Sequence, residues 1–380
     1  MPQEQVYTNA RIVLEDQIVE GSLLVREGRI IEIQPGPATG GEDLGGDYLI
    51  PGLVELHTDH LESHYSPRPG LRWGKMAAIQ AYDTQIAGSG ITTVFDCLRL
   101  GSDDDGDGFK TGEMRAMADA LAEATGENRL RAEHRIHLRC EVSMDNLLDQ
   151  FDAFRDDPQV GLISLMDHAP GQRQFQTMDQ YIFYYKTKRG LSDEAFAVFV
   201  ERQLDLSARN SARHRATLSA LCAERGIPVA SHDDATAAHV EESIALGVRL
   251  AEFPTSLEAA TLSHEGGLSV LMGAPNVVRG GSHSGNIAAA DLARHGVLDV
   301  LSSDYVPFSL IHAPFLLADE IDTLSLPAAI AMVTSTPAKT VGLDDRGRIA
   351  PGLKADLVRV ERRSDVPIVR GVWRDGRRVA

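Results

Sequence analysis

The sequence predicts an α/β protein: a (β/α)8 TIM barrel with a small β-sandwich domain formed by both chain ends. Two observations lead to this prediction. Between residues 51 and 349, eight short apolar runs alternate with helix-like segments. Outside that region, the chain consists of short β-rich runs separated by turn signals. We therefore expect a composite β-domain from residues 1–50 and 350–380, and a catalytic barrel from residues 51–349.

The eight apolar runs are the predicted barrel strands. In chain order they are YLIPGLVELHTD, GITTVFDCL, HRIHLRCEV, VGLISLMDH, IPVASHDD, RLAEFPTS, LSVLMGAPN and LDVLSSDY. Segments with helical periodicity follow several of them, for example MRAMADALAEATG and ARHRATLSALCAERG. Eight such strands within about 300 residues match the size of one barrel.

The two chain ends have the same strand-like pattern. The first contains YTNARIVL, GSLLVREG and RIIEIQPG, and the last contains DLVRVERR and PIVRGVWRDGRRVA, with a tight Asp-Gly turn. An isolated hairpin is marginally stable in water, so we expect the two ends to pair into one domain. Two unrelated terminal hairpins are the alternative.

Composition excludes several classes of protein. The chain has 37 Lys and Arg against 55 Asp and Glu, a formal net charge of −18, which argues against a duplex nucleic acid as partner. No apolar run is long enough to span a bilayer, and the first residues carry no basic and apolar secretory signal. Cys97, Cys140 and Cys222 are odd in number and far apart, which suits a reducing compartment. We expect a cytoplasmic protein.

Potential metal ligands gather where the predicted strands end, which is where barrel active sites lie. These ligands are His57, Asp59, Glu141, His168 and His232. One isolated histidine is more often structural, but three at the same end of separate strands favour a metal site. Neutral imidazoles with carboxylates suit Zn, Mn or Fe, and two such ions could share Glu141 as a bridge. The alternative for Glu141 is an ion pair with Arg139 or Arg173.

Asp304 is the predicted general base. A divalent metal lowers the pKa of bound water, and a nearby carboxylate then has to accept its proton. Asp304 ends the eighth run after two serines. Its alternative role is to cap the following helix.

A glycine-rich segment after the seventh run predicts an anion site. It reads GAPNVVRGGSHSGN and contains Arg279, Gly280, Gly281, Ser282 and His283. Backbone N–H groups in such a loop can cradle phosphate, and arginine can bind it bidentately. The spacing differs from that of a P-loop, and a plain flexible loop is the alternative.

A long basic and aromatic segment follows the fourth run and is expected to form a lid over the barrel mouth. It contributes Arg173 and Lys186 as predicted substrate contacts, and Arg99, after the second run, is expected on the same rim. The alternative is a helix that packs its aromatic residues on the barrel. Cations gathered on an acidic protein point to a polyanionic substrate.

These motifs resemble the amidohydrolase superfamily, which has a terminal β-domain around a barrel, PGLVELHTDH on the first strand and a late aspartate. More closely, the chain resembles the family of α-D-ribose 1-methylphosphonate 5-triphosphate diphosphatases of the carbon–phosphorus lyase pathway. The matching segments run from about residue 50 to 345. They include LVELHTDHLE, AEHRIHLRCE, SLMDHAPGQRQF, ASHDDATAAHV and VLMGAPNVVRGGSHSGN.

The resemblance implies metal-dependent hydrolysis of the ribose triphosphate to its 5-phosphate and diphosphate. It implies that His57, Asp59, Glu141, His168 and His232 bind metal and that Asp304 handles the proton. Most of the superfamily has histidine where this chain has Asp59, a bridging lysine is absent from the predicted strand ends, and the two later histidines fall on the fourth and fifth runs.

The predicted partner is thus a phosphorylated ribose, with a homodimer as the base-rate expectation. One alternative is a cyclic amidase or deaminase, the commoner chemistry of the superfamily, which needs a less cationic site. Another is a sensor or scaffold without catalysis, which a full ligand set with Asp304 argues against.

Overall fold

The computed structural model describes residues 4–101, 112–173, 182, 192–282 and 285–380 of the 380-residue chain. The chain divides into two compact units. The terminal unit comprises Met1–Asp96, Ala120–Arg135 and Met272–Ala380. The central unit comprises Cys97–Asp119 and Ile136–Leu271.

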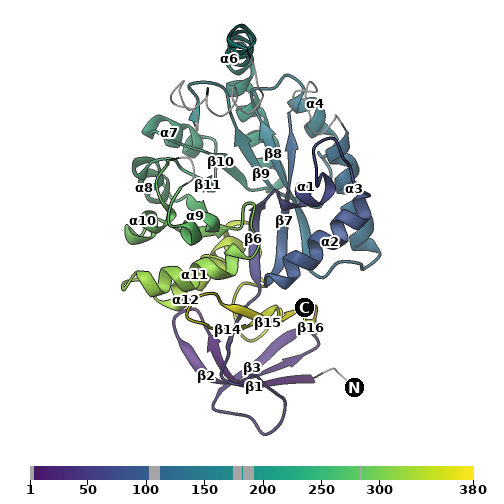
Figure 1. Cartoon of the computed structure of the whole chain (residues 1–380), viewed down its shortest axis with the longest axis vertical. Coiled ribbons are helices and arrows are strands. Elements are labelled where there is room, and N and C mark those ends of the chain that lie inside the picture. The colour runs from purple at the N-terminus through teal and green to yellow at the C-terminus, as the bar shows by residue number, and fades with distance from the viewer. Residues whose placement is uncertain (1–3, 102–111, 174–181, 183–191, 283–284) are drawn as a thin grey trace. The chain divides into compact units, whose positions relative to one another are not determined.

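The chain ends share one sheet of the terminal unit. Its strands, in chain order, are β1 (Glu4–Val13), β2 (Ile18–Arg26), β3 (Arg29–Pro35), β4 (Glu42–Asp43), β5 (Tyr48–Pro51), β14 (Leu357–Glu361), β15 (Ile368–Arg374) and β16 (Arg377–Arg378). In the sheet they lie in the order β16-β15-β14-β5-β1-β2-β3, and β4 pairs with β1. Figure 1 shows purple N-terminal strands beside yellow C-terminal ones. The pairing of β14 with β5 confirms that both ends build one β-domain, whereas its boundaries at residues 50 and 350 stay a prediction.

Local sequence explains two features of this sheet. Asp375 and Gly376 both have positive φ, 49° and 70°, and join β15 to β16 in the two-residue turn that the Asp-Gly pair predicted. The core of the sheet holds Tyr7 against Trp373, edge to face with ring centroids 5.0 Å apart. A core residue from each end of the chain therefore stabilises the pairing.

The second sheet is parallel and contains the eight predicted runs. In the order of the chain, its strands are β6 (Leu53–Thr58), β7 (Ile91–Leu100), β8 (Glu133–Glu141), β9 (Val160–Met166), β10 (Val229–His232), β11 (Leu250–Glu252), β12 (Ser269–Gly273) and β13 (Val300–Ser302). A parallel bridge between Thr58 and Asp304 brings the ends of the first and last strands together. The sheet is a nearly closed eight-stranded barrel, which confirms the predicted fold class.

Helices follow the strands, as expected of a (β/α)8 chain. They are α1 (His60–Tyr65), α2 (Lys75–Gly88), α3 (Glu113–Gly126), α4 (Leu147–Asp152), α6 (Asp193–Arg225), α7 (Ala237–Ala245), α8 (Leu257–Glu265), α9 (Ala274–Arg279), α10 (Ala289–Arg294), α11 (Ser309–Glu320), α12 (Leu326–Ala331) and α13 (Ser335–Thr340). Hydroxyl side chains at the start of α6, α7, α8 and α12 accept a backbone N–H three residues later. Within the described ranges, none of these helices is both long and apolar enough to cross a membrane.

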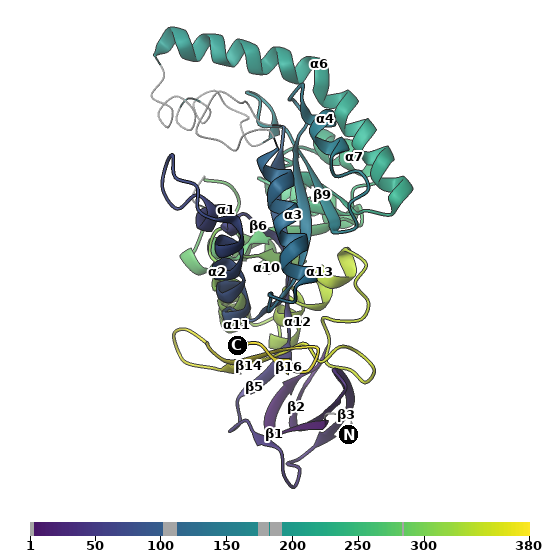
Figure 2. The same ribbon diagram turned by 90° about the vertical axis from the view of Figure 1, so that its right-hand side faces the viewer.

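The central unit contains one unusually long helix, α6, drawn as a single uninterrupted helix in Figure 2. Its buried face is largely polar. Asn210 donates to the Ser143 carbonyl at 3.0 Å, and His214 Nδ1 lies 2.9 Å from the Val142 carbonyl. The helix thereby satisfies the backbone of the loop after β8, which would otherwise be buried without partners.

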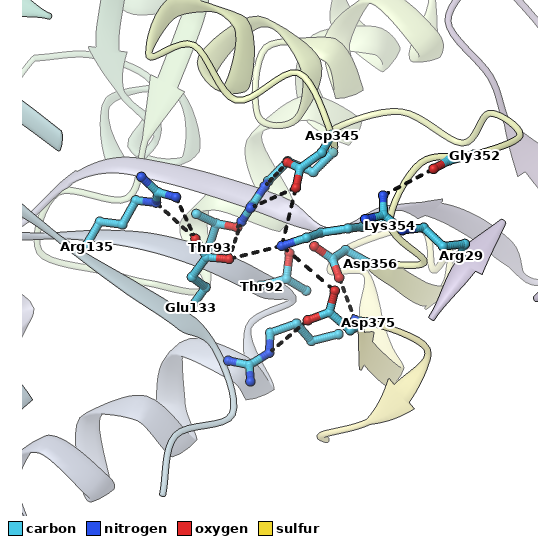
Figure 3. A network of polar contacts seen from close by, with 12 residues as sticks. Arg29, Thr92, Thr93, Glu133, Arg135, Asp345, Gly352, Lys354, Asp356 and Asp375 are labelled. Carbon is cyan, nitrogen blue, oxygen red and sulfur yellow. Dashed lines mark hydrogen bonds and ion pairs between the residues drawn. The ribbon is translucent and has the colours of Figure 1, made fainter. Parts of the chain in front are cut away.

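A polar network crosses the terminal unit near the beginning of β8 (Figure 3). The buried guanidinium of Arg346 donates to Glu133 at 2.7 Å and to Thr93 at 2.8 Å. Lys354 contacts the same Glu133 oxygen at 3.3 Å. Burial would raise the pKa of Glu133, but Arg346 and Lys354 lower it to about 2. The network joins barrel strands to the segment that leads into β14.

A second buried group in this unit is His134, which lies between two carboxylates. Its Nδ1 is 2.8 Å from Asp96 and its Nε2 is 3.3 Å from Asp83. Burial alone would lower the pKa of this imidazole, but Asp96 and Asp83 raise it to about 9. His134 is therefore a buried cation at neutral pH.

Replacing Arg346 by methionine should destabilise the fold, because it leaves Glu133 partly buried with only lysine and the neighbouring Arg135 as cations. Breaking a buried pair costs about 3–5 kcal/mol, and we expect a value near the lower end. Urea unfolding followed by circular dichroism measures the change. A loss below about 0.5 kcal/mol would show that the network does not stabilise the fold.

His134 should make the free energy of unfolding fall as the pH rises. Because its pKa is higher in the folded chain, about 9 against 6.5, its contribution is complete below pH 6.5 and is lost as the pH rises through 9. The full change corresponds to roughly 3 kcal/mol. The stability difference between wild type and His134→Gln should therefore shrink between pH 6 and pH 10. A difference that stays constant over that interval would contradict the assignment.

Candidate metal centre

In the terminal unit, the ends of the first and eighth barrel strands bring His57 close to Asp304. The Asp304 N–H donates to the His57 carbonyl at 3.1 Å, and the Thr58 hydroxyl donates to the Asp304 carbonyl at 2.8 Å. Asp304 has a φ of +52°, so the backbone turns sharply there. Asp59 follows at the residue before α1 and makes no side-chain cap with it.

Glu55 holds these two strand ends together and was missed by the sequence reasoning. Its fully buried carboxylate accepts the N–H of His57 and the N–H of Ser303, both at 2.6 Å. Burial raises the pKa of Glu55 to about 8. A charged residue inside the apolar run VELH was the signal available in the sequence.

In the central unit, Glu141 at the end of β8 contacts His168 after β9. The carboxylate accepts the His168 N–H at 2.9 Å and lies 2.5 Å from its Nδ1. Arg99 donates to the same carboxylate at 3.1 Å, and 45% of its side chain is exposed. Burial would raise the pKa of Glu141, but His168 and Arg99 lower it to about 2. Its role as a bridging ligand stays a prediction.

His232 at the end of β10 has an equivalent carboxylate partner. Its Nδ1 lies 3.1 Å from Glu252, the last residue of β11. Asp233 follows in the left-handed region, with a φ of +58°, and burial raises the pKa of its carboxyl to about 6. Among the described residues, nothing hydrogen-bonds the buried Oδ2 of Asp233.

Three ligand atoms of the central unit converge. Asp233 Oδ2 lies 3.5 Å from His232 Nε2 and 3.9 Å from His168 Nε2, and all three fall within 4.8 Å of one another. Each imidazole directs Nδ1 toward a carboxylate, the usual arrangement when Nε2 binds a metal. The unsatisfied Asp233 oxygen supplies the negative charge that a divalent ion would neutralise. The residues present therefore fit a transition-metal ion.

Sequence reasoning found two members of this group, His168 and His232, on the fourth and fifth strands as counted. It missed Asp233 and Glu252 as site residues. Asp233 was one of two adjacent aspartates after His232, and Glu252 lay inside a run that looked like an ordinary strand. The neighbouring sequence does not distinguish these two acidic residues from acidic residues on the protein surface.

Arg173 lies elsewhere than expected of a lid residue. It is only 3% exposed, and its guanidinium pairs with Asp234 and, at 2.6 Å, with Glu242. Burial lowers the pKa of Arg173 to about 10. Lys186, the other residue predicted from that segment, lies outside the described residues.

The glycine-rich segment is partly helical rather than a continuous loop. Pro275 lies in the first turn of α9, which ends at Arg279 with Gly280 as a left-handed cap. Arg279 and Gly280 are exposed, Gly281 has a φ of 152°, and the Ser282 hydroxyl accepts the Asn286 N–H at 3.3 Å. His283 lies outside the described residues. Anion binding by this segment stays a prediction.

Replacing Asp233 by asparagine should weaken metal binding by about 10- to 100-fold, because the change removes the anionic oxygen that faces both imidazoles. Competition of Mn²⁺ with a chromophoric chelator measures the affinity. Asp291→Asn, on the exposed part of α10, is a matched control. Unchanged affinity in the Asp233 variant would remove this residue from the site.

Comparison with known proteins agrees with the fold. A family model described as the amidohydrolase family matches residues 84–380. An α-D-ribose 1-methylphosphonate 5-triphosphate diphosphatase from Escherichia coli (strain K12) is 45% identical over 377 residues, which cover 98% of this chain and all of that protein. An imidazolonepropionase from Ruegeria sp. (strain TM1040) is 26% identical and covers 83% of this chain and 78% of its own length.

Among solved structures, an N-acetyl-D-glucosamine-6-phosphate deacetylase from Mycobacterium smegmatis covers both chains completely. Its TM-score is 0.64 at 15% identity, which speaks for the fold alone. The family match covers most of the chain, and the Escherichia coli relative matches nearly all of it. The chain belongs to the amidohydrolase family.

Proposed function

We propose that the chain is a metal-dependent diphosphatase that hydrolyses α-D-ribose 1-methylphosphonate 5-triphosphate. The products are the 5-phosphate and diphosphate, which places the reaction in carbon–phosphorus lyase phosphonate catabolism. The observation that carries this proposal is the 45% identity to a diphosphatase of that name, over the whole length of both proteins. The buried histidine and carboxylate group of the central unit supports it.

The proposed metal ligands combine sequence prediction and geometry. His168 and His232, with Asp233, would hold one divalent ion. His57, Asp59 and Glu141 are proposed as further metal ligands from the sequence alone. Zn, Mn and Fe all suit this donor set. When bound, the ions supply acidified water and neutralise phosphate charge.

Asp304 is the proposed proton acceptor. Its backbone is anchored to the His57 carbonyl and to Thr58, so its carboxylate is carried on a fixed strand end. In the reaction, the oxygen of water bonds to phosphorus, the bond between the first and second phosphates breaks, and Asp304 takes the water proton. Diphosphate leaves as the second product.

Cations near the strand ends are proposed to bind the substrate phosphates. Arg99 presents a half-exposed guanidinium beside Glu141. Arg279 at the end of α9 and Gly280 after it are exposed, and Gly281 and Ser282, which follow, are partly exposed. We propose that these four residues bind a phosphate. His283 and Lys186 remain predicted contacts from the sequence alone.

A cyclic amidase or deaminase is the alternative within the family. The 26% identity to an imidazolonepropionase is the reason to test this alternative.

A cytoplasmic location and a homodimer are also proposed from the sequence.

Phosphorus NMR tests the reaction directly. The protein is incubated with the ribose methylphosphonate triphosphate and Mn²⁺, and a chelated sample serves as control. We expect metal-dependent appearance of diphosphate and of a single remaining 5-phosphate. Stepwise orthophosphate would indicate a different triphosphatase, and turnover of a cyclic amide instead would favour the alternative.

Replacing His168 by asparagine should lower kcat at least about a hundredfold with little change in folding, because it removes an imidazole that faces Asp233. His295→Asn is the matched control, since this histidine is exposed and its Nδ1 lies 2.8 Å from the Asp291 carbonyl, one turn earlier. Diphosphate release gives the rate, and circular dichroism checks the fold. A fully active His168 variant would exclude this residue as a ligand.

A further inference from the structure

The two residues next to the candidate ligands in the central unit are themselves buried carboxylates. Asp167 precedes His168, and Asp234 follows Asp233; they are 2% and 1% exposed. A buried carboxylate is costly unless cations or hydrogen-bond donors compensate it. The residues that compensate these two therefore also fix the backbone that carries the ligands.

Asp167 is held by one face of α6. Its Oδ2 accepts the hydroxyls of Ser207 at 3.0 Å and Ser211 at 2.7 Å, and Arg215 donates to it at 3.3 Å. These three residues are spaced by four along the helix, so they lie on the same face. The helix thereby anchors the residue directly before His168.

Asp234 is held by Arg173 and by α7. Arg173 pairs with one carboxylate oxygen, and the Ser243 hydroxyl donates to the other at 2.9 Å. Arg173 also donates to Glu242 at 2.6 Å, and Arg215 lies 3.7 Å from the second oxygen of Glu242. Glu242, whose side chain is 38% exposed, thus joins the two anchors into one ion network. The network consists of Glu242 and the buried residues Asp167, Arg173, Arg215 and Asp234.

Asp233 needs such an anchor because of its backbone. A φ of +58° is unfavourable for a residue other than glycine and persists only where its surroundings hold it. The Asp233 N–H donates to the Glu252 carbonyl at 2.9 Å, and the Thr255 N–H donates to the Asp234 carbonyl at 2.9 Å. The Asp234 side chain adds the contact with Arg173.

We propose that this ion network positions His168, His232 and Asp233 for metal binding, and that Arg173 is a positioning residue instead of a substrate contact. The proposal rests on the proposed function, since the metal-dependent reaction defines what has to be positioned. The 3% exposure of Arg173 leaves no surface for a phosphate, in contrast to the 45% exposed side chain of Arg99.

The test compares Arg173→Met and Arg173→Lys with wild type and with Arg346→Met. Arg346 is a matched control because it is also a buried arginine that pairs with two carboxylates, in its case Glu133 and Asp345. For each protein, the Mn²⁺ dissociation constant is measured by chelator competition. The kcat and KM for the ribose triphosphate are measured at saturating Mn²⁺.

Arg173→Met should weaken Mn²⁺ binding about 10- to 100-fold, the usual effect of losing a residue that orients metal ligands. The KM of Arg173→Met should stay within about threefold of the wild-type value. The Mn²⁺ affinity of Arg173→Lys should fall between those of wild type and Arg173→Met. Arg346→Met should lose stability and keep its Mn²⁺ affinity. If Arg173→Met does not fold, Ser211→Ala and Glu242→Gln each remove one contact and should weaken Mn²⁺ binding a few-fold.

Unchanged Mn²⁺ affinity in these variants, or a KM raised tenfold or more with metal binding intact, would overturn the proposal and favour direct substrate contact. Equal loss of Mn²⁺ affinity in Arg346→Met would also overturn it, since any buried charge lesion would then suffice. The proposed function fails separately if the wild-type protein releases no diphosphate at any Mn²⁺ concentration. A wild-type protein that does not bind Mn²⁺ would overturn both the proposed function and the positioning role of the ion network.

Discussion

Buried carboxylates at the carboxyl ends of the parallel strands are the constraint on which the site depends. A buried carboxylate is stable only beside a cation, a hydrogen-bond donor or a metal ion, and each carboxylate here has a different kind of partner. Glu55 takes two backbone N–H groups, Glu141 takes His168 and Arg99, and Asp234 takes Arg173. Asp233 keeps one oxygen without a hydrogen bond among the described residues, and that oxygen faces Nε2 of both His168 and His232, so an ion fits there.

The same principle acts with a different result in the network around Arg346. Glu133 there is compensated by Arg346 and Lys354 together, which lowers its pKa to about 2 and leaves no demand for a metal. Residues at the beginnings of barrel strands generally serve stability, and those at the carboxyl ends serve chemistry. Here the charge of Glu133, at the beginning of a strand, is balanced by two cations, whereas the charge of Asp233, at the carboxyl end of a strand, is left for a metal ion to balance.

Much of this could be predicted from the sequence, because the signals are local. The eight apolar runs became strands, and Asp375 with Gly376 became the predicted turn. The rest depends on contacts between distant segments. Arg173 looked like an exposed lid residue, but its partners Asp234 and Glu242 lie between 60 and 69 residues later in the chain. Likewise, Asp233 differs from Asp234 in its left-handed backbone and in its hydrogen bond to Glu252 on the adjacent strand β11, and neither feature is visible in the sequence.

Anomalous X-ray diffraction from crystals grown with Mn²⁺ tests the central claim, that incompletely compensated ligands at the strand ends hold a catalytic metal. We expect an anomalous peak bonded to His168 Nε2, His232 Nε2 and Asp233 Oδ2, with Glu252 still on Nδ1 of His232. A peak that none of these atoms contacts would contradict it, as would full Mn²⁺ occupancy in an Asp233→Asn crystal.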